Sequence, residues 1–408
     1  MFPRCCRMGC LSFECKRCRL FRINIILLWI GVVSVACVTV NWIILQTGSR
    51  STSPPEVMHL AAVSCGRPNY QGIRDIKKPM DQTLTMIKSA SLFAHNPLHI
   101  HIFTENDMIS MFQTEIDAWP ARVRSRVTYS IRPIDYERYL PPTLITQWKK
   151  WYKPCGSFRL LLPMVLKDVT DAAIYSDSDV IFIKPIDELW AQLKEMDERQ
   201  VAAISPTAGH PLGGSKLNEN FISHSTGLFQ INTGVMVLNF TRMLSSDWLL
   251  FHDEHKTDQS ELRRVKYGID LLLPYYDEYK EKAEHDQKLL NIMFHFNPSL
   301  LRQLPCSWNF KNNFCQDEDN TCSVAERGGA GAVHGITSAF FNDVNPTFRA
   351  LYESFLQYDF EPNLDKYLLQ PYLQQLAETA EGTFCLTKSH VITTSLKSSV
   401  GRLMAQEN

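Results

Sequence analysis

The longest uninterrupted hydrophobic stretch of the chain lies near its N-terminus. Residues 23–45 contain no Asp, Glu, Lys or Arg over 23 positions. As a helix that rises about 1.5 Å per residue, this stretch would be about 34 Å long, enough to cross a hydrocarbon core of roughly 30 Å. A cleaved signal peptide is the alternative, but its apolar core usually has only about 7–15 residues. We therefore predict a transmembrane signal-anchor helix at residues 23–45.

Basic residues mark the orientation of this helix. Residues 1–22 contain six Lys or Arg residues and one acidic residue, and only Arg50 follows the apolar stretch closely. By the positive-inside rule the N-terminus is cytoplasmic and the rest of the chain is lumenal. A short Ser-, Thr- and Pro-rich segment follows the helix. We therefore predict a cytoplasmic tail at residues 1–22 and a stem at residues 46–56 of a single-pass type II membrane protein.

After the stem, the pattern alternates between short apolar runs and helical periodicity. Alternation of this kind indicates an α/β domain with a mixed, mainly parallel sheet, whose ligands bind beyond the carboxyl ends of its strands. We place a catalytic domain at residues 57–370 and a C-terminal extension at residues 371–408. The predicted strands are His59–Ser64, Leu98–Phe103, Val127–Ile131 and Ala172–Tyr175, and the predicted helices are Asp81–Ala94 and Gly156–Leu166.

Composition adds the sign of the charge and excludes one class of partner. The chain has 408 residues, of which 45% are hydrophobic and 21% charged, an ordinary globular balance. Without the basic tail, 36 Lys and Arg residues stand against 42 Asp and Glu residues. A mildly acidic body lacks the positive field on which nucleic-acid binding rests, so we expect no nucleic-acid partner.

Six cysteines fall in the predicted lumenal part of the chain. An even number permits disulfides in an oxidising compartment but does not determine their pairing. The closely spaced Cys306, Cys315 and Cys322 suggest at least one local bridge. Their spacing does not match a CxxC zinc site. The six residues are Cys65, Cys155, Cys306, Cys315, Cys322 and Cys385.

The segment with the clearest chemistry is Asp177-Ser178-Asp179, which follows an apolar strand and precedes Val180-Ile181-Phe182. Two carboxylates in apolar surroundings are costly to bury unless a positive charge neutralises them. Alternate residues of an extended segment project to one side, so Asp177 and Asp179 can converge on one divalent cation, with Ser178 turned away. Such a cation can hold the two phosphates of a sugar nucleotide. The alternative is a solvated loop without a metal.

Several further segments occur in an order that resembles glycosyltransferase family 8, whose members are retaining enzymes with the GT-A fold that use UDP-sugars. The resemblance covers roughly residues 58–360. Within it, Leu304–Asn309 and Asn345–Ala350 are similar to the glucoside xylosyltransferases. The family landmarks are Ser64–Gly66, Arg159–Pro163, Asp177–Asp179, Asn232–Val235, His285–Asn291 and Val333–Gly335.

The resemblance implies a manganese site made of Asp177, Asp179 and His334. An imidazole and two carboxylates leave open positions for phosphate oxygens on an octahedral ion. Glycines shortly before His334 permit a turn that brings it near a distant strand.

The resemblance also implies two catalytic residues, Asp286 and Gln287, beside the reacting sugar. Asp286 can accept hydrogen bonds from sugar hydroxyls, and Gln287 can present both a donor and an acceptor near the anomeric carbon. Since a neutral amide is a poor nucleophile, we expect front-face attack rather than double displacement, in which Asp286 would be the nucleophile. Asn232 is expected to face the donor. Arg159 is expected to contact it, or alternatively to pair with an acid on an exposed helix face.

The remaining substrate-binding positions that the resemblance implies are Cys65, Gly66 and Gly335. Cys65 and Gly66 are expected to pass close to the uracil and ribose, which makes Cys65 a poorer candidate for a disulfide. The chain departs from the glucoside xylosyltransferases after Gly335. Where those commonly have a polar, basic stretch, this chain has Ile336-Thr337-Ser338-Ala339-Phe340. This departure weakens the expected grip on the pyrophosphate.

The resemblance implies transfer of xylose from UDP-xylose to O-linked glucose on EGF-like repeats of Notch-type proteins, in α-1,3 linkage and with Mn²⁺. The expected location is the membrane of the endoplasmic reticulum or Golgi. One alternative is transfer from another UDP-sugar, such as UDP-glucose or UDP-galactose. The other is an inactive, tethered glycan-binding pseudoenzyme, which the departure after Gly335 favours.

Overall fold

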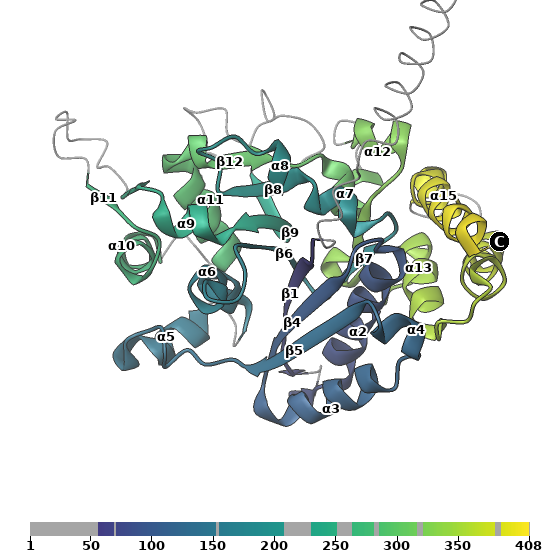
Figure 1. Cartoon of the computed structure of the whole chain (residues 1–408), viewed down its shortest axis with the longest axis horizontal. Coiled ribbons are helices and arrows are strands. Elements are labelled where there is room, and N and C mark those ends of the chain that lie inside the picture. The colour runs from purple at the N-terminus through teal and green to yellow at the C-terminus, as the bar shows by residue number, and fades with distance from the viewer. Residues whose placement is uncertain are drawn as a thin grey trace, which may run out of the picture. The chain divides into compact units, whose positions relative to one another are not determined.

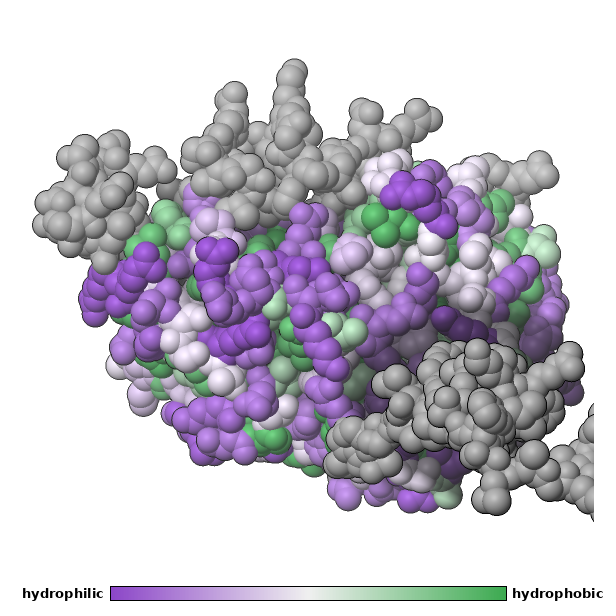
Figure 2. Space-filling view, turned by 45° about the horizontal axis from the view of Figure 1, so that its top comes forward, coloured by the Kyte–Doolittle hydropathy of each residue, from purple (hydrophilic) through white to green (hydrophobic). Residues whose placement is uncertain are grey.

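The computed structural model describes residues 56–68, 71–151, 155–207, 230–250, 263–280, 285–315, 321–379 and 385–407, all within one compact unit, Glu56–Asn408. The predicted cytoplasmic tail, membrane helix and nearly all of the stem lie outside these residues. Among the helices of the described ranges, none is long and apolar enough to span a bilayer. On the face shown in Figure 2, hydrophobic residues lie scattered among polar ones.

Seven strands form the central sheet, in the order β12-β8-β9-β6-β1-β4-β5 (Figure 1). Neighbouring strands are parallel except where β9 runs antiparallel to β6 and β8. The prediction of a mixed, mainly parallel sheet is therefore confirmed. All four predicted strands are present, with limits within two residues of those expected. The strands are β1 (Met58–Ser64), β4 (Leu98–Thr104), β5 (Val127–Pro133), β6 (Ala172–Ser176), β8 (Ala202–Pro206), β9 (Ile231–Asn239) and β12 (Leu301–Gln303).

Both faces of the central sheet are covered, so successive side chains of a strand enter different cores. On β1, Leu60 and Ala62 lie in one hydrophobic cluster, whereas Ala61 lies in the other. The first cluster includes residues of α2 and α3, and the second includes residues of α6, α10 and α11. These helices are α2 (Lys77–Phe93), α3 (Asn106–Asp117), α6 (Leu162–Leu166), α10 (Ile269–Tyr279) and α11 (Asp286–Phe296). Shorter or peripheral ones are α4 (Ala121–Arg124), α5 (Pro142–Trp151), α7 (Ile186–Trp190), α8 (Gln192–Glu195), α9 (Phe240–Ser245) and α12 (Ser323–Gly328).

The helix predicted at residues 156–166 is two helices instead. A 3-10 helix, η1 (Gly156–Leu161), is followed directly by α6. Pro163 lies in the first turn of α6, where a missing backbone N–H breaks no helical hydrogen bond. The proline therefore starts a new helix, and Arg159 lies on the 3-10 segment before it.

A separate three-stranded sheet connects the segment after the acidic motif to the segment that contains His334. In this sheet β14 is antiparallel to β7, with His334 opposite Val180. The Gly335 N–H donates to the Asp179 carbonyl at 2.8 Å. Gly329, shortly before β14, has a φ of 76°, a conformation that favours glycine. The strands of this sheet are β7 (Val180–Phe182), β13 (Phe310–Lys311) and β14 (Ala332–His334). Two separate two-stranded sheets consist of β2 (Arg67–Pro68) with β3 (Arg74–Asp75), and of β10 (Trp248–Leu249) with β11 (Arg264–Val265).

The predicted C-terminal extension contributes to the first hydrophobic cluster. Tyr372, Val391 and Leu396 are buried there beside residues of α13. Figure 1 shows the last helix in yellow, close to α12 and α13. The helices of this region are α13 (Pro346–Gln357), α14 (Gln370–Ala377) and α15 (Ser389–Glu407).

Three disulfides pair all six of the cysteines expected in the lumen. The predicted local bridge is Cys306–Cys322, and the other two are Cys315–Cys385 and Cys65–Cys155. The expectation that Cys65 is a poor disulfide candidate is therefore wrong. That expectation assumed that a cysteine close to the uracil and ribose could not also form a disulfide. A cysteine that lines a cavity can still form a disulfide with a neighbouring cysteine, as Cys65 does with Cys155. Disulfides of this number indicate a domain that folds in the oxidising lumen of the secretory pathway.

Candidate active site

Asp177, Asp179 and His334 come together at the carboxyl end of β6. Their potential ligand atoms all lie within 4.8 Å of one another. The His334 Nε2 atom is 3.2 Å from Asp179 Oδ1 and 4.0 Å from Asp177 Oδ2. The two carboxylates converge through a turn between β6 and β7 rather than along an extended segment, and Ser178 lines the same cavity instead of turning away. These three side chains form a group that could hold a metal ion.

The charge of Asp179 suits that role. Burial by itself would raise the pKa of its carboxyl group, but the positive charge and hydrogen bond of the His334 imidazole outweigh burial and lower it. The carboxylate is therefore ionised at neutral pH, which is the form that binds cations.

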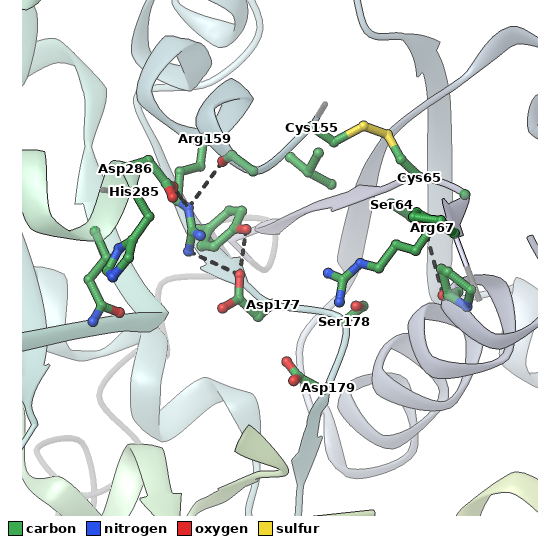
Figure 3. Close-up of a pocket in the computed structure, with 17 residues that line it drawn as sticks. Ser64, Cys65, Arg67, Cys155, Arg159, Asp177, Ser178, Asp179, His285 and Asp286 are labelled. Atoms are coloured by element: carbon green, nitrogen blue, oxygen red, sulfur yellow. Dashed lines mark hydrogen bonds and ion pairs between the residues drawn. A yellow bond between two sulfur atoms is a disulfide. The ribbon is translucent and has the colours of Figure 1, made fainter. Parts of the chain in front are cut away.

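Arg159 links the metal group to Asp286. Its Nη1 atom donates to Asp177 Oδ1 at 3.0 Å, and its Nε atom forms an ion pair with Asp286, at the start of α11 (Figure 3). The Arg159 side chain is only 11% exposed, so it does not lie on an exposed helix face. The Tyr175 hydroxyl donates to the same Asp177 oxygen at 2.7 Å. Burial raises the pKa of Tyr175 well above its usual range, so this hydroxyl keeps its proton and its hydrogen bond.

Gln287, the next residue of α11, is held by β9. Its Oε1 atom accepts hydrogen bonds from the Thr233 backbone N–H at 3.1 Å and the Thr233 hydroxyl at 3.2 Å. A backbone N–H can only donate, so the oxygen must face β9. Gln287 therefore offers its amide N–H groups to the cavity, rather than both a donor and an acceptor.

Asn232 and Gly335 lie behind the metal group. The Asn232 side chain accepts a hydrogen bond from the Gly234 N–H at 3.0 Å and another from Asn309 Nδ2 at 2.8 Å. It is 9% exposed and is engaged with the protein interior. A Cβ atom at Gly335 would collide with the Phe340 ring, so glycine is needed there for packing.

One cavity of about 810 Å³ connects the remaining positions. Figure 3 shows Arg159 between Asp286 and Asp177 on one side, with Cys65 and its disulfide partner on another. Gly66 also lines the cavity, although its backbone N–H is engaged by the Glu105 carboxylate at 2.8 Å. The cavity brings together most of the predicted site residues: Cys65, Gly66, Arg159, Asp177, Asp179, Asp286 and Gln287.

The departure after Gly335 has a structural explanation. Phe340 is 1% exposed and stacks on Tyr352, so its apolar side chain serves the core. Thr337 lines a second cavity of about 540 Å³, and two cations, Arg67 and Lys78, line it too. Positive charge therefore stands near the metal group, although it comes from another part of the chain.

Sequence reasoning did not single out four residues that shape the site: Arg67, Cys155, Thr233 and Asn309. Arg67 and Cys155 line the main cavity, and Arg67 directly follows the expected Gly66. Thr233 lies inside the landmark segment Asn232–Val235. Asn309 ends the segment Leu304–Asn309, which is similar to the glucoside xylosyltransferases. No local pattern marks them as functional, because their contacts are made with residues far away in sequence.

The central sheet is mainly parallel, two acidic residues follow the carboxyl end of β6, and β14 of the separate small sheet brings a histidine to them. This is a GT-A-like fold. A solved structure of the galactosyltransferase LgtC, in complex with donor and acceptor sugar analogues, has this fold. It aligns with 76% of this chain and 99% of its own chain, with a TM-score of 0.51 and 14% identity.

Sequence comparison identifies the family. Glucoside xylosyltransferase 1 of Gallus gallus is 35% identical over 359 residues, which cover 88% of this chain and 76% of that protein. Glucoside xylosyltransferase 2 of Mus musculus is 34% identical over 346 residues, which cover 83% and 71%. No family model matches the chain. At this identity and coverage, the chain belongs to the glucoside xylosyltransferase family.

Proposed function

We propose that the chain is a Mn²⁺-dependent, retaining enzyme that transfers xylose from UDP-xylose to O-linked glucose on EGF-like repeats, in α-1,3 linkage. The observation that carries the proposal is that Asp177 and Asp179, next to His334, share one cavity with Asp286 and Gln287. The names of the relatives specify a xylosyl group and a glucoside. The proposed acceptor, an EGF-like repeat, and the proposed α-1,3 linkage are carried over from the resemblance of the sequence motifs to the glucoside xylosyltransferases.

The three clustered side chains fit an octahedral divalent cation. Two carboxylates and one imidazole, all within 4.8 Å, leave coordination positions open for phosphate oxygens. When bound, the cation would neutralise the diphosphate and stabilise the negative charge of the departing UDP.

On the sugar side of the cavity, Asp286 and Gln287 offer complementary groups. The Asp286 carboxylate is 6% exposed and paired with Arg159, which leaves it lone pairs that can accept hydrogen bonds from sugar hydroxyls. The Gln287 amide N–H groups can donate to an oxygen near the anomeric carbon. Because Arg159 also contacts Asp177, it sets the spacing between the sugar side and the phosphate side of the cavity.

This arrangement favours front-face transfer over double displacement. Double displacement needs a carboxylate nucleophile at the anomeric carbon, and Asp286 is held in an ion pair that lowers its nucleophilicity. In front-face transfer, the bond from the anomeric carbon to the phosphate oxygen breaks as the acceptor oxygen bonds on the same face. The acceptor's proton passes to the departing β-phosphate oxygen. The configuration is retained.

We also propose the cellular setting. Residues 23–45 anchor the chain in the membrane of the endoplasmic reticulum or Golgi, with the catalytic unit in the lumen. The three disulfides of the described residues support an oxidising compartment.

The test is transfer by the purified full-length protein. With UDP-xylose, Mn²⁺ and a glucosylated EGF-like repeat, we expect UDP release and an α-1,3-linked product. EDTA should abolish both UDP release and product formation, and added Mn²⁺ should restore them. In Asp179→Asn both should be absent, and added Mn²⁺ should not restore them. Faster turnover with UDP-glucose or UDP-galactose would replace the proposed donor. Donor binding without transfer or hydrolysis would indicate a glycan-binding pseudoenzyme.

A further inference from the structure

Asn309 lies behind His334 in the second layer of the metal group. It is fully buried, at 0% exposure, on the 3-10 helix η4 (Cys306–Asn309). Its Oδ1 atom is 2.8 Å from His334 Nδ1. Its Nδ2 atom donates to the Asn232 backbone carbonyl at 3.1 Å and to Asn232 Oδ1 at 2.8 Å. The amide therefore spans the space between β9 and the imidazole.

Two backbone groups of β9 determine which way both amides point. The Gly234 N–H can only donate, so the Asn232 atom that faces it at 3.0 Å must be the oxygen. The Asn232 backbone carbonyl can only accept, so the Asn309 atom that faces it must be the nitrogen. These constraints agree, and they direct the Asn309 oxygen at His334 without any assumption about the imidazole.

The orientation of Asn309 in turn requires a proton on one particular imidazole nitrogen. An amide oxygen cannot donate, so His334 Nδ1 must be protonated and donate to it. The Nε2 atom then faces Asp179 and Asp177, at 3.2 and 4.0 Å. Gly234 makes room for this ring position, because a Cβ atom there would collide with the imidazole.

We propose that Asn309 is a positioning residue that keeps His334 protonated at Nδ1 and directs its Nε2 atom toward Asp177 and Asp179, so that the three ligands are oriented before a divalent cation binds. The inference rests on the metal role given to these three side chains under the proposed function. Groups that orient a ligating histidine in this way typically change metal affinity about 10–100-fold when they are replaced.

The first measurement needs no metal and no activity. Histidine-selective ¹⁵N NMR of the metal-free, full-length protein should show a hydrogen-bonded, slowly exchanging proton on His334 Nδ1, assigned by its loss in His334→Gln. Asn309→Leu, which has no acceptor oxygen, should lose this signal. An unprotonated Nδ1 in the wild-type protein would overturn the inference.

The second measurement is Mn²⁺ affinity, from the decrease of the free-ion EPR signal on titration. Asn309→Leu should bind Mn²⁺ about 10–100-fold more weakly than wild type. Asn312→Leu, at another buried asparagine of the same region, is the matched control and should leave both signals unchanged. Equal Mn²⁺ affinity of Asn309→Leu and wild type would overturn the inference while leaving the proposed function intact. If wild type and His334→Gln bound Mn²⁺ equally poorly, the proposed function would fail, and the NMR signal would still decide the role of Asn309.

Discussion

Arg159 lies between two carboxylates, one partly buried and one buried, and neutralises both. It pairs with Asp177, which is 26% exposed, and with Asp286, which is 6% exposed, while its own side chain is 11% exposed. Replacement by Met keeps much of the length and removes the charge. Removing one partner of a buried ion pair typically costs about 3–5 kcal/mol, because the other charge is left uncompensated. We expect Arg159→Met to lower the free energy of unfolding by that amount.

Burial should be the cause of this cost, and the chain offers a matched control. Arg349 also pairs with two acids, Asp343 and Glu353, but its side chain is 43% exposed. Solvent screens such pairs, so we expect Arg349→Met to cost about 1 kcal/mol or less.

The measurement is urea unfolding of the full-length protein with its disulfides intact, followed by tryptophan fluorescence. The double variant Arg159→Met/Asp286→Asn should be more stable than Arg159→Met alone, with a coupling energy of about 1–3 kcal/mol. If Arg159→Met and Arg349→Met lost the same stability, or if the double variant recovered none, Arg159 would not compensate buried charge in solution.

Three further predictions concern other parts of the fold. Burial, followed by the charges of neighbouring histidines, lowers the pKa of His101 to about 3. The unfolded state then binds the proton more tightly, so the stabilisation is complete above pH 6.5 and falls below it. Between pH 7 and pH 5, the free energy of unfolding of His101→Gln, measured by urea unfolding, should therefore fall by about 2 kcal/mol less than that of wild type. A Cβ atom at Gly234 would collide with His334, so Gly234→Ala should cost about 1–3 kcal/mol in the same assay, whereas Gly328→Ala, with open space around its Cβ position, should stay within about 0.5 kcal/mol of wild type. The Cys65–Cys155 bridge spans 90 residues, so its replacement by two serines should cost about 2–5 kcal/mol; a variant with an unchanged urea midpoint would show that the bridge does not constrain the unfolded chain.

Local pattern was sufficient to predict the strands and the acidic pair. Most residues of β1 and β4 are apolar because the sheet is covered on both faces, so these strands can be recognised without knowledge of their partners. Asp177 and Asp179 are close in sequence, so any fold places them close in space. Pro163 shows the limit of such patterns, since helical periodicity continues through a position where one helix ends and another begins.

The sequence by itself determined which residues are the candidates for the chemistry: the acidic pair, the motif residues Asp286 and Gln287, and His334. It also determined the even set of cysteines after the predicted membrane helix. Only the tertiary structure decided how they are used. It paired Cys65 with Cys155, turned Asn232 inward, and placed Arg159 between two carboxylates. The physical reason is that a side chain's type is local, whereas its hydrogen-bond partner and the charge beside it depend on the packing of distant segments.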